Sequence, residues 1–127
     1  MRKSLWTGRI TSAVLVTFLL VDAVGKLFQL GPVLEGTARL GYPVTIVGAI
    51  GLVELLCTLA YATPSTAVVG AILLTGYLGG ATATHVRIGD PLLSHTLFPV
   101  ACGVLIWGAL FLRDPRLRAL VPLRDTV

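Results

Sequence analysis

The sequence predicts an all-α fold: one domain covering residues 1–127, built as an integral membrane four-helix transmembrane bundle. Hydrophobic residues make up 55% of the chain and its mean hydropathy is +0.89, well above the usual composition of soluble domains. Charged residues account for only 13%, and most of them lie near the two ends. Four apolar stretches are each about 20 residues long, the length that a helix needs to cross a bilayer. Lipid is therefore expected to cover most of the protein.

The first two predicted helices are bounded by turn-forming residues. The first covers residues 10–30 and is expected to end at the Gly-Pro pair that follows, because proline disrupts a helix interior. The second covers residues 44–62, between Pro43 and Pro64. A cleaved signal peptide is an alternative for the first stretch, since the chain starts with basic residues. We favour a retained helix because the apolar run is long for a signal peptide.

Capping and turn-forming residues also bound the other two predicted helices. Ser65 or Thr66 is expected to cap a third helix over residues 67–85, because a hydroxyl side chain satisfies free amides at a helix start. A Gly-Asp-Pro turn then precedes a fourth helix over residues 95–112. The tail beyond it is short, basic and interrupted by proline.

The basic residues predict the orientation of the bundle in the cell (inner) membrane. Positive residues favour the cytoplasmic side, so both termini are expected in the cytoplasm, in agreement with four crossings. The loops at 31–43 and 86–94 then face outward. No nucleic acid partner is expected, because the basic residues neither interleave with aromatics nor follow one helix face. The basic residues of the two ends are Arg2, Lys3, Arg9, Arg113, Arg116, Arg118 and Arg124.

Small residues and cysteines give weaker indications. Gly76 and Gly80 share a face of the third helix, where small residues allow close helix packing in lipid, so this helix is expected to be the central packing element. Cys57 and Cys102 form no CxxC motif and fall at different depths, so both are expected to stay reduced. No metal site is expected, because the histidines lack the spacing of metal ligands.

Six polar residues inside the predicted helices mark a candidate intramembrane site. Helix rise places Asp22, Glu54 and Tyr77 about 15 to 18 Å from their membrane boundaries, near the middle of a core about 30 Å thick. Lys26 lies one turn from Asp22 on the same helix face. The histidines lie at the outer ends of the third and fourth helices, so the set describes a polar pocket that opens outward. The set is Asp22, Lys26, Glu54, Tyr77, His85 and His95.

The ionisable groups of this set do not balance in charge. Two carboxylates and one ammonium leave one excess negative charge, so a shared proton, a histidinium or a bound cation is expected nearby. A structural alternative is that Asp22, Lys26 and Glu54 only hold the bundle together. For His85 and His95 the corresponding alternative is a position at the membrane interface, where a polar ring tip reaches water.

The chain resembles the DoxX-like family of small four-helix bacterial membrane proteins, and the resemblance covers nearly its whole length. DoxX-type proteins are named for a subunit of a thiosulfate:quinone oxidoreductase, and others are associated with membrane redox or thiol-stress complexes. The resemblance therefore implies a redox partner. It rests on Asp22-Ala23-Val24-Gly25-Lys26, Leu40-Gly41-Tyr42-Pro43, Glu54 with Cys57, Thr75 to Ala81, Thr84-His85-Val86-Arg87, His95, Phe98-Pro99 and Trp107.

Three functional hypotheses follow from these features. The leading one is a membrane subunit, not an autonomous enzyme, whose outward-opening pocket binds a small ligand such as a quinone in support of a membrane or peripheral redox partner. A quinone suits a pocket with apolar walls and nearby donors and protons. The alternatives are a proton, cation or small-solute transport module, and a non-enzymatic scaffold or assembly factor. A homo-oligomer is compatible with each of them.

Overall fold

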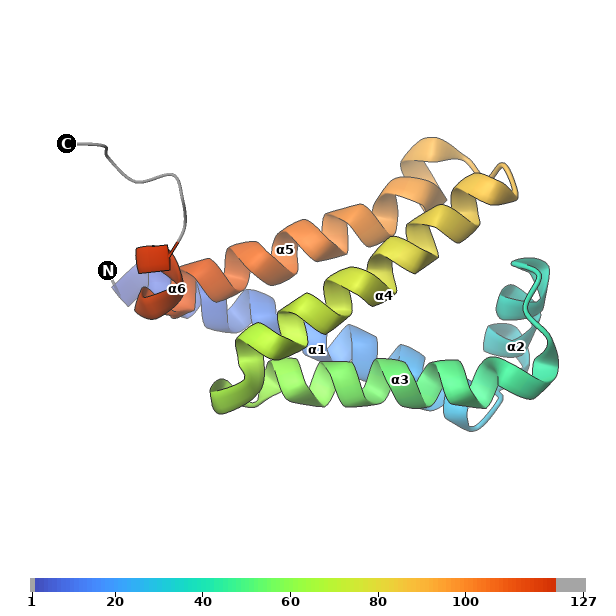
Figure 1. Cartoon of the computed structure of the whole chain (residues 1–127), viewed down its shortest axis with the longest axis horizontal. Helices are drawn as coiled ribbons and strands as arrows, with labels where there is room; N and C mark the ends of the chain where they lie inside the picture. The colour runs from blue at the N-terminus through green and yellow to red at the C-terminus, as the bar shows by residue number, and fades with distance from the viewer. Residues whose placement is uncertain (1, 121–127) are drawn as a thin grey trace.

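The computed structural model describes residues 2–120 and consists of helices joined by short loops (Figure 1). Four segments are long and apolar enough to cross a membrane, which confirms the predicted all-α membrane bundle: Arg2–Leu27, Val44–Ala62, Pro64–Arg87 and Leu92–Arg113. Arg124 of the predicted basic tail lies outside the described residues. The elements are α1 (Arg2–Leu27), α2 (Gly31–Arg39), α3 (Val44–Ala62), η1 (Pro64–Thr66), α4 (Ala67–Arg87), η2 (Leu92–Thr96), α5 (Leu97–Arg113) and α6 (Pro115–Leu120).

The start and the end of the first helix differ from the sequence prediction. Helix α1 begins at Arg2 and ends at Leu27, and the chain then turns through Gln29 with φ of 52°. The Gly31-Pro32 pair does not stop this helix; it begins the short helix α2 instead. Proline is tolerated in the first turn of a helix, where its missing N–H is not needed. The prediction of a loop over residues 31–43 was therefore wrong for residues 31–39, which form this helix.

The start of the last membrane helix is also different from the expected one. A single π-helical turn, η2, precedes α5, so His95 lies in this turn and not in the regular helix. At the other end, Pro115 begins the short helix α6, in the segment described above as a short, basic tail interrupted by proline.

The four membrane helices form a ring in which each one packs against two others. Helix α1 contacts α3 and α5, and α4 contacts the same two helices from the opposite side. Within residues 2–120, α1 and α4 make no close backbone contact, so they occupy diagonal positions. Helices α3 and α4 meet at η1 and diverge towards the end of the bundle that carries α2 (Figure 1). We call this the α2 end and the opposite one the α6 end.

The closely packed core lies in the half of the bundle near the α6 end. Large side chains from all four helices are buried there, including Leu15, Tyr61, Leu74 and Ile106. The Tyr61 hydroxyl donates a hydrogen bond to the carbonyl oxygen of Ile106 at 2.8 Å, which satisfies the polar group inside the apolar core.

The glycines that permit close packing are not those predicted. A Cβ added at Gly76 or Gly80 would meet open space, so the prediction that this face makes α4 the central packing element was wrong. A Cβ at Gly70 would lie 2.2 Å from the backbone nitrogen of Tyr61, where α3 and α4 meet. A Cβ at Gly51 would lie 2.9 Å from the carbonyl oxygen of Ala23 on α1. A Cβ at Gly8 of α1 would likewise lie 2.7 Å from the carbonyl oxygen of Ala109 on α5, so close approach occurs between α3 and both α1 and α4, and between α1 and α5.

Candidate functional site

A cavity of about 830 Å³ occupies the half of the bundle towards the α2 end. Residues of α1, α2, α3, α4 and α5 line it, and most of its wall is apolar. Gly76 and Gly80 face it, and their missing side chains leave room between α4 and α3. Apolar wall residues include Phe18, Ile50, Val53 and Phe98. A cavity of this size and lining matches the usual properties of small-molecule sites.

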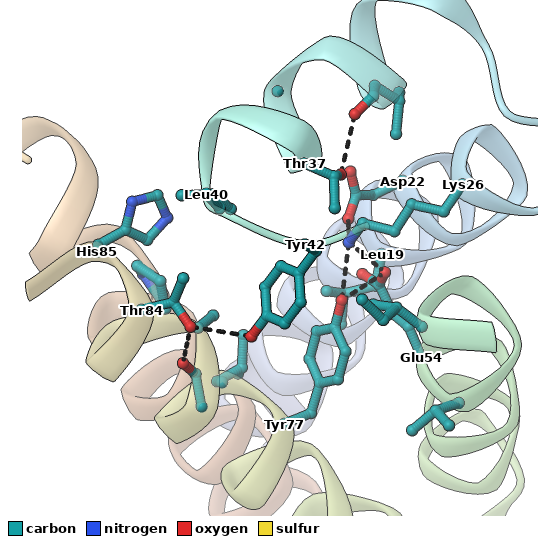
Figure 2. Close-up of a pocket in the computed structure, with 18 of the residues that line it drawn as sticks. Leu19, Asp22, Lys26, Thr37, Leu40, Tyr42, Glu54, Tyr77, Thr84 and His85 are labelled. Atoms are coloured by element: carbon teal, nitrogen blue, oxygen red, sulfur yellow. Dashed lines mark hydrogen bonds and ion pairs between the residues drawn. The ribbon is translucent and has the colours of Figure 1, made fainter. Parts of the chain in front are cut away.

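Four of the six predicted polar residues meet at one point on the wall of this cavity (Figure 2). The Lys26 ammonium donates hydrogen bonds to Asp22 Oδ2 at 2.6 Å, to Glu54 Oε2 at 2.8 Å and to the Tyr77 hydroxyl at 2.7 Å. The Tyr77 hydroxyl donates in turn to Glu54 Oε2 at 3.0 Å. We call Asp22, Lys26, Glu54 and Tyr77 the charged cluster.

Local helix geometry explains how the cluster assembles. Asp22 and Lys26 are one turn apart on α1, so their side chains share a face. Gly51 precedes Glu54 by three residues on the same face of α3, and its missing Cβ lets Lys26 lie close, since an added Cβ would be 2.7 Å from that of Lys26. Tyr77 reaches the cluster from α4, whose backbone makes no close contact with that of α1. The Lys26–Tyr77 hydrogen bond therefore crosses the bundle on its diagonal.

The members of the charged cluster differ in their access to the cavity. The side chain of Glu54 is 1% exposed and that of Lys26 is 13% exposed, whereas that of Asp22 is 37% exposed. Asp22 is therefore the ionisable group of the cluster that a molecule in the cavity meets first.

A second group of charges lies at the α2 end. Arg39, in the last turn of α2, donates to both carboxylate oxygens of Asp90, at 2.7 and 3.2 Å. The Nδ1 atom of His85 lies 2.5 Å from Asp90 Oδ2. The Arg39 guanidinium and the His85 ring hold the pKa of the Asp90 carboxyl well below its usual range. Asp90 in turn raises the pKa of Arg39. We call Arg39, His85 and Asp90 the mouth cluster.

Further hydrogen bonds tie the chain after α2 to the end of α4. The Thr84 hydroxyl donates to the carbonyl oxygen of Gly80 at 2.8 Å, so the Tyr42 hydroxyl, 3.0 Å away, donates to Thr84 (Figure 2). Arg87 donates to the carbonyl oxygen of Leu40 at 3.0 Å. Together with the mouth cluster, these bonds hold the α2 segment over the cavity.

The two predicted histidines have different surroundings. His85 lines the cavity as part of the mouth cluster. His95 is exposed, its Nδ1 lies 2.8 Å from the Ser94 hydroxyl, and its ring centroid lies 6.0 Å from that of His85. The described structure therefore brings Asp22, Lys26, Glu54 and Tyr77 together, with His85 at the mouth and His95 beside it.

Sequence reasoning missed Arg39, Tyr42, Thr84 and Asp90 as residues around the cavity. Arg39 and Asp90 carry opposite charges, and they lie in the two loops that were predicted to be on the same side of the membrane. Their ion pair could therefore have been predicted from the sequence. Tyr42 and Thr84 belong to segments that carry the family resemblance, but nothing in the sequence placed their hydroxyls beside the cavity.

A family model supports the interpretation of the whole bundle. The model of the DoxX-like family matches residues 10–109, a segment that runs from α1 into α5 and contains both clusters. The chain belongs to the DoxX-like family. No curated protein and no solved structure shows significant similarity to it.

The two cysteines of this DoxX-like protein lie inside the bundle as free thiols. Cys57 and Cys102 are both buried, and Cys102 lines the cavity. Within residues 2–120, no three His, Cys, Asp or Glu side chains are grouped so that they could hold a metal ion. The ionisable groups with charged partners on the cavity wall are those of the charged cluster and the mouth cluster.

Proposed function

We propose that this DoxX-like protein is a ligand-binding subunit of the cell membrane that supports a redox partner. Its cavity takes a small, mainly apolar molecule with a polar head group, and a quinone, whose reduced quinol form carries phenolic hydroxyls, is the ligand class that the family resemblance implies. The observation that carries the proposal is the charged cluster on the wall of an apolar cavity of about 830 Å³. Apolar walls with a few convergent polar groups are the usual composition of a small-molecule site.

The accessibility of Asp22 supports ligand binding over a purely structural cluster. Ionisable groups in a membrane protein are costly, and those that only link helices are best kept closed and fully paired. Here the Asp22 side chain remains 37% exposed and lines the cavity. The open space at Gly76 and Gly80 gives a ligand room beside it.

The packed half of the bundle favours binding over transport. A molecule or ion that crossed the protein would have to pass Leu15, Tyr61, Leu74 and Ile106, which are buried together between the cavity and the α6 end. Interiors packed in this way contain few voids as large as a water molecule.

The proposed orientation places the α2 end outside the cell and both termini in the cytoplasm. Arg2, Lys3 and Arg9 precede or begin the first span, and three more arginines lie between residues 113 and 118. This excess of basic residues at the α6 end matches the rule that cytoplasmic segments are positive. The cavity then opens to the outer side of the membrane.

Substitution of neighbouring glycines tests the proposed cavity. Gly80 faces the cavity, whereas Gly79 faces a separate shallow groove between α4 and α5, and a Cβ at either position meets no other atom within 4 Å. Gly80→Leu should fill part of the cavity and weaken binding of decylubiquinol, the reduced form of decylubiquinone with two hydroxyl donors, at least about tenfold, the effect of losing about 1.4 kcal/mol. Gly79→Leu is the matched control and should bind like the wild type.

Native mass spectrometry and thermal stabilisation of protein in nanodiscs provide the measurements. Equal binding by wild type, Gly79→Leu and Gly80→Leu would place the ligand outside the cavity, and absence of binding in all three would refute a quinone ligand. Isolation of an oxidoreductase together with the protein from gently solubilised membranes tests the proposed redox partner.

A further inference from the structure

On the basis of the proposed ligand site, we infer that the cavity selects head groups that donate hydrogen bonds, and that it discriminates against head groups that only accept them. A phenolic hydroxyl and a protonated amine are head groups of the favoured kind. The inference follows from the number of hydrogens that the charged cluster has to donate and from where each of them goes.

The donors of the charged cluster are all used inside it. A lysine ammonium has three N–H groups, and that of Lys26 lies within 2.8 Å of three oxygens, one each from Asp22, Glu54 and Tyr77. The hydroxyl hydrogen of Tyr77 goes to Glu54 Oε2. A molecule that reaches the cluster therefore finds no free donor unless one of these bonds breaks.

Acceptors, in contrast, remain available. The bonds of the cluster use Asp22 Oδ2 and Glu54 Oε2, and no described residue donates to Asp22 Oδ1 or Glu54 Oε1. A carboxylate has about four lone-pair sites for hydrogen bonds. Because the Asp22 side chain is 37% exposed and lines the cavity, its free oxygen is the acceptor that a head group reaches first.

Other hydroxyls on the cavity wall also donate their hydrogens to oxygen atoms of the protein. The Thr37 hydroxyl donates to the carbonyl oxygen of Val33 at 2.9 Å, Thr84 donates to Gly80, and Tyr42 donates to Thr84. Arg39 keeps free N–H groups, but its guanidinium is held by Asp90 in the mouth cluster. The wall next to the charged cluster therefore offers oxygens to a ligand, and the remaining N–H donors, those of Arg39 and His85, lie at the mouth of the cavity.

The charge of the cluster acts in the same direction. Asp22 and Glu54 share the single ammonium of Lys26, so the ionised cluster carries one excess negative charge. A donor hydrogen brings partial positive charge to Asp22, and an ammonium head group brings a full one. An ether or carbonyl oxygen brings negative partial charge towards the carboxylates and gains no hydrogen bond there.

Three ligands that share a 4-butylphenyl group test this selectivity: 4-butylphenol, 4-butylbenzylamine and 4-butylanisole. The phenol is a neutral donor, the amine is a cationic donor, and the anisole is an acceptor without a donor. Binding is measured by calorimetry in phosphatidylcholine nanodiscs, with empty nanodiscs subtracted to remove partitioning into lipid. The wild type should bind at least one of the two donors at least about tenfold more tightly than the anisole.

Two matched variants assign the selectivity to Asp22. Asp22→Asn replaces the free acceptor by an amide that also donates, so the preference for the donors over the anisole should fall to less than about threefold. Glu35→Gln makes the same chemical change on the exposed side of α2 and should keep the wild-type preference. The wild-type comparison alone remains informative if Asp22→Asn does not fold.

The outcomes separate this inference from the proposed function. If the wild type binds 4-butylanisole as tightly as the donors or more tightly, the inference is overturned but the ligand site remains. The same holds if folded Asp22→Asn keeps the wild-type preference for the donors over 4-butylanisole. Failure of all three molecules to bind removes the ligand site itself, and the inference with it.

Discussion

Replacement of Lys26 by methionine is the sharpest test of the charged cluster. Methionine fills a similar volume but removes the ammonium that contacts Asp22, Glu54 and Tyr77 at 2.6 to 2.8 Å. The Glu54 side chain, which is 1% exposed, then has no positive partner in the cluster. Loss of one partner of a buried ion pair typically lowers the free energy of unfolding by about 3 to 5 kcal/mol. We expect a loss in that range for Lys26→Met.

Addition of Glu54→Gln to Lys26→Met should recover part of this loss, because the double variant no longer buries an unpaired carboxylate. The free energy of unfolding of the wild type, both single variants and the double variant forms a double-mutant cycle. Coupled residues typically deviate from additivity by about 0.5 to 3 kcal/mol. Unfolding is followed by circular dichroism as sodium dodecyl sulfate is added to mixed micelles at neutral pH.

Lys3→Met is the matched control, because Lys3 is exposed near the start of the same helix. It should change the free energy of unfolding by no more than about 0.5 kcal/mol, as surface substitutions usually do. The reasoning fails if the losses of Lys26→Met and Glu54→Gln add without coupling, since Lys26 then does not stabilise Glu54.

Three further predictions concern the mouth cluster, the orientation and the thiols. The pKa of Asp90 is lowered in the folded protein, so its contribution to stability is present above the unfolded pKa of about 3.9 and declines as the pH falls below it. Asp90→Asn should remove this part of the acid dependence in unfolding titrations, whereas Glu35→Gln should keep it; identical curves for Asp90→Asn and wild type would contradict the role of the mouth cluster. A membrane-impermeant maleimide should label Gly36→Cys from outside intact cells, in a background without native cysteines, and labelling from the cytoplasmic side alone would reverse the proposed orientation. Cys57 and Cys102 should remain reduced in purified protein, and a bridge between them in non-reducing peptide mapping would contradict their predicted separation in depth.

The sequence was sufficient to predict the membrane helices because their signal is local. A run of about 20 apolar residues identifies a span without knowledge of its neighbours. The same depth arithmetic placed Asp22, Glu54 and Tyr77 at similar levels, and the structure joins all three through Lys26. Local rules were ambiguous at Gly31-Pro32, because such a pair both follows helices and begins them.

The cavity and the mouth cluster depend on which helix faces lie opposite each other. The spacing of residues along the sequence does not give these pairings. Gly76 and Gly80 share a helix face in any model, but sequence spacing does not distinguish a face packed against a helix from one that faces a cavity. The pairing of Arg39 with Asp90 joins residues 51 positions apart, and it requires both the helix α2 and the order of the helices in the ring. Both were established only by the structure.

The diagonal contact between Lys26 and Tyr77 has a mechanical consequence. Because the backbones of α1 and α4 make no close contact, the hydrogen bond between these two long side chains links the diagonal helices directly at this level. Removal of either side chain therefore weakens the link between α1 and α4 beside the cavity, whereas the core near Tyr61 and Ile106 does not depend on it. The separation of the two helices thus rests on side-chain contacts at one end of the bundle.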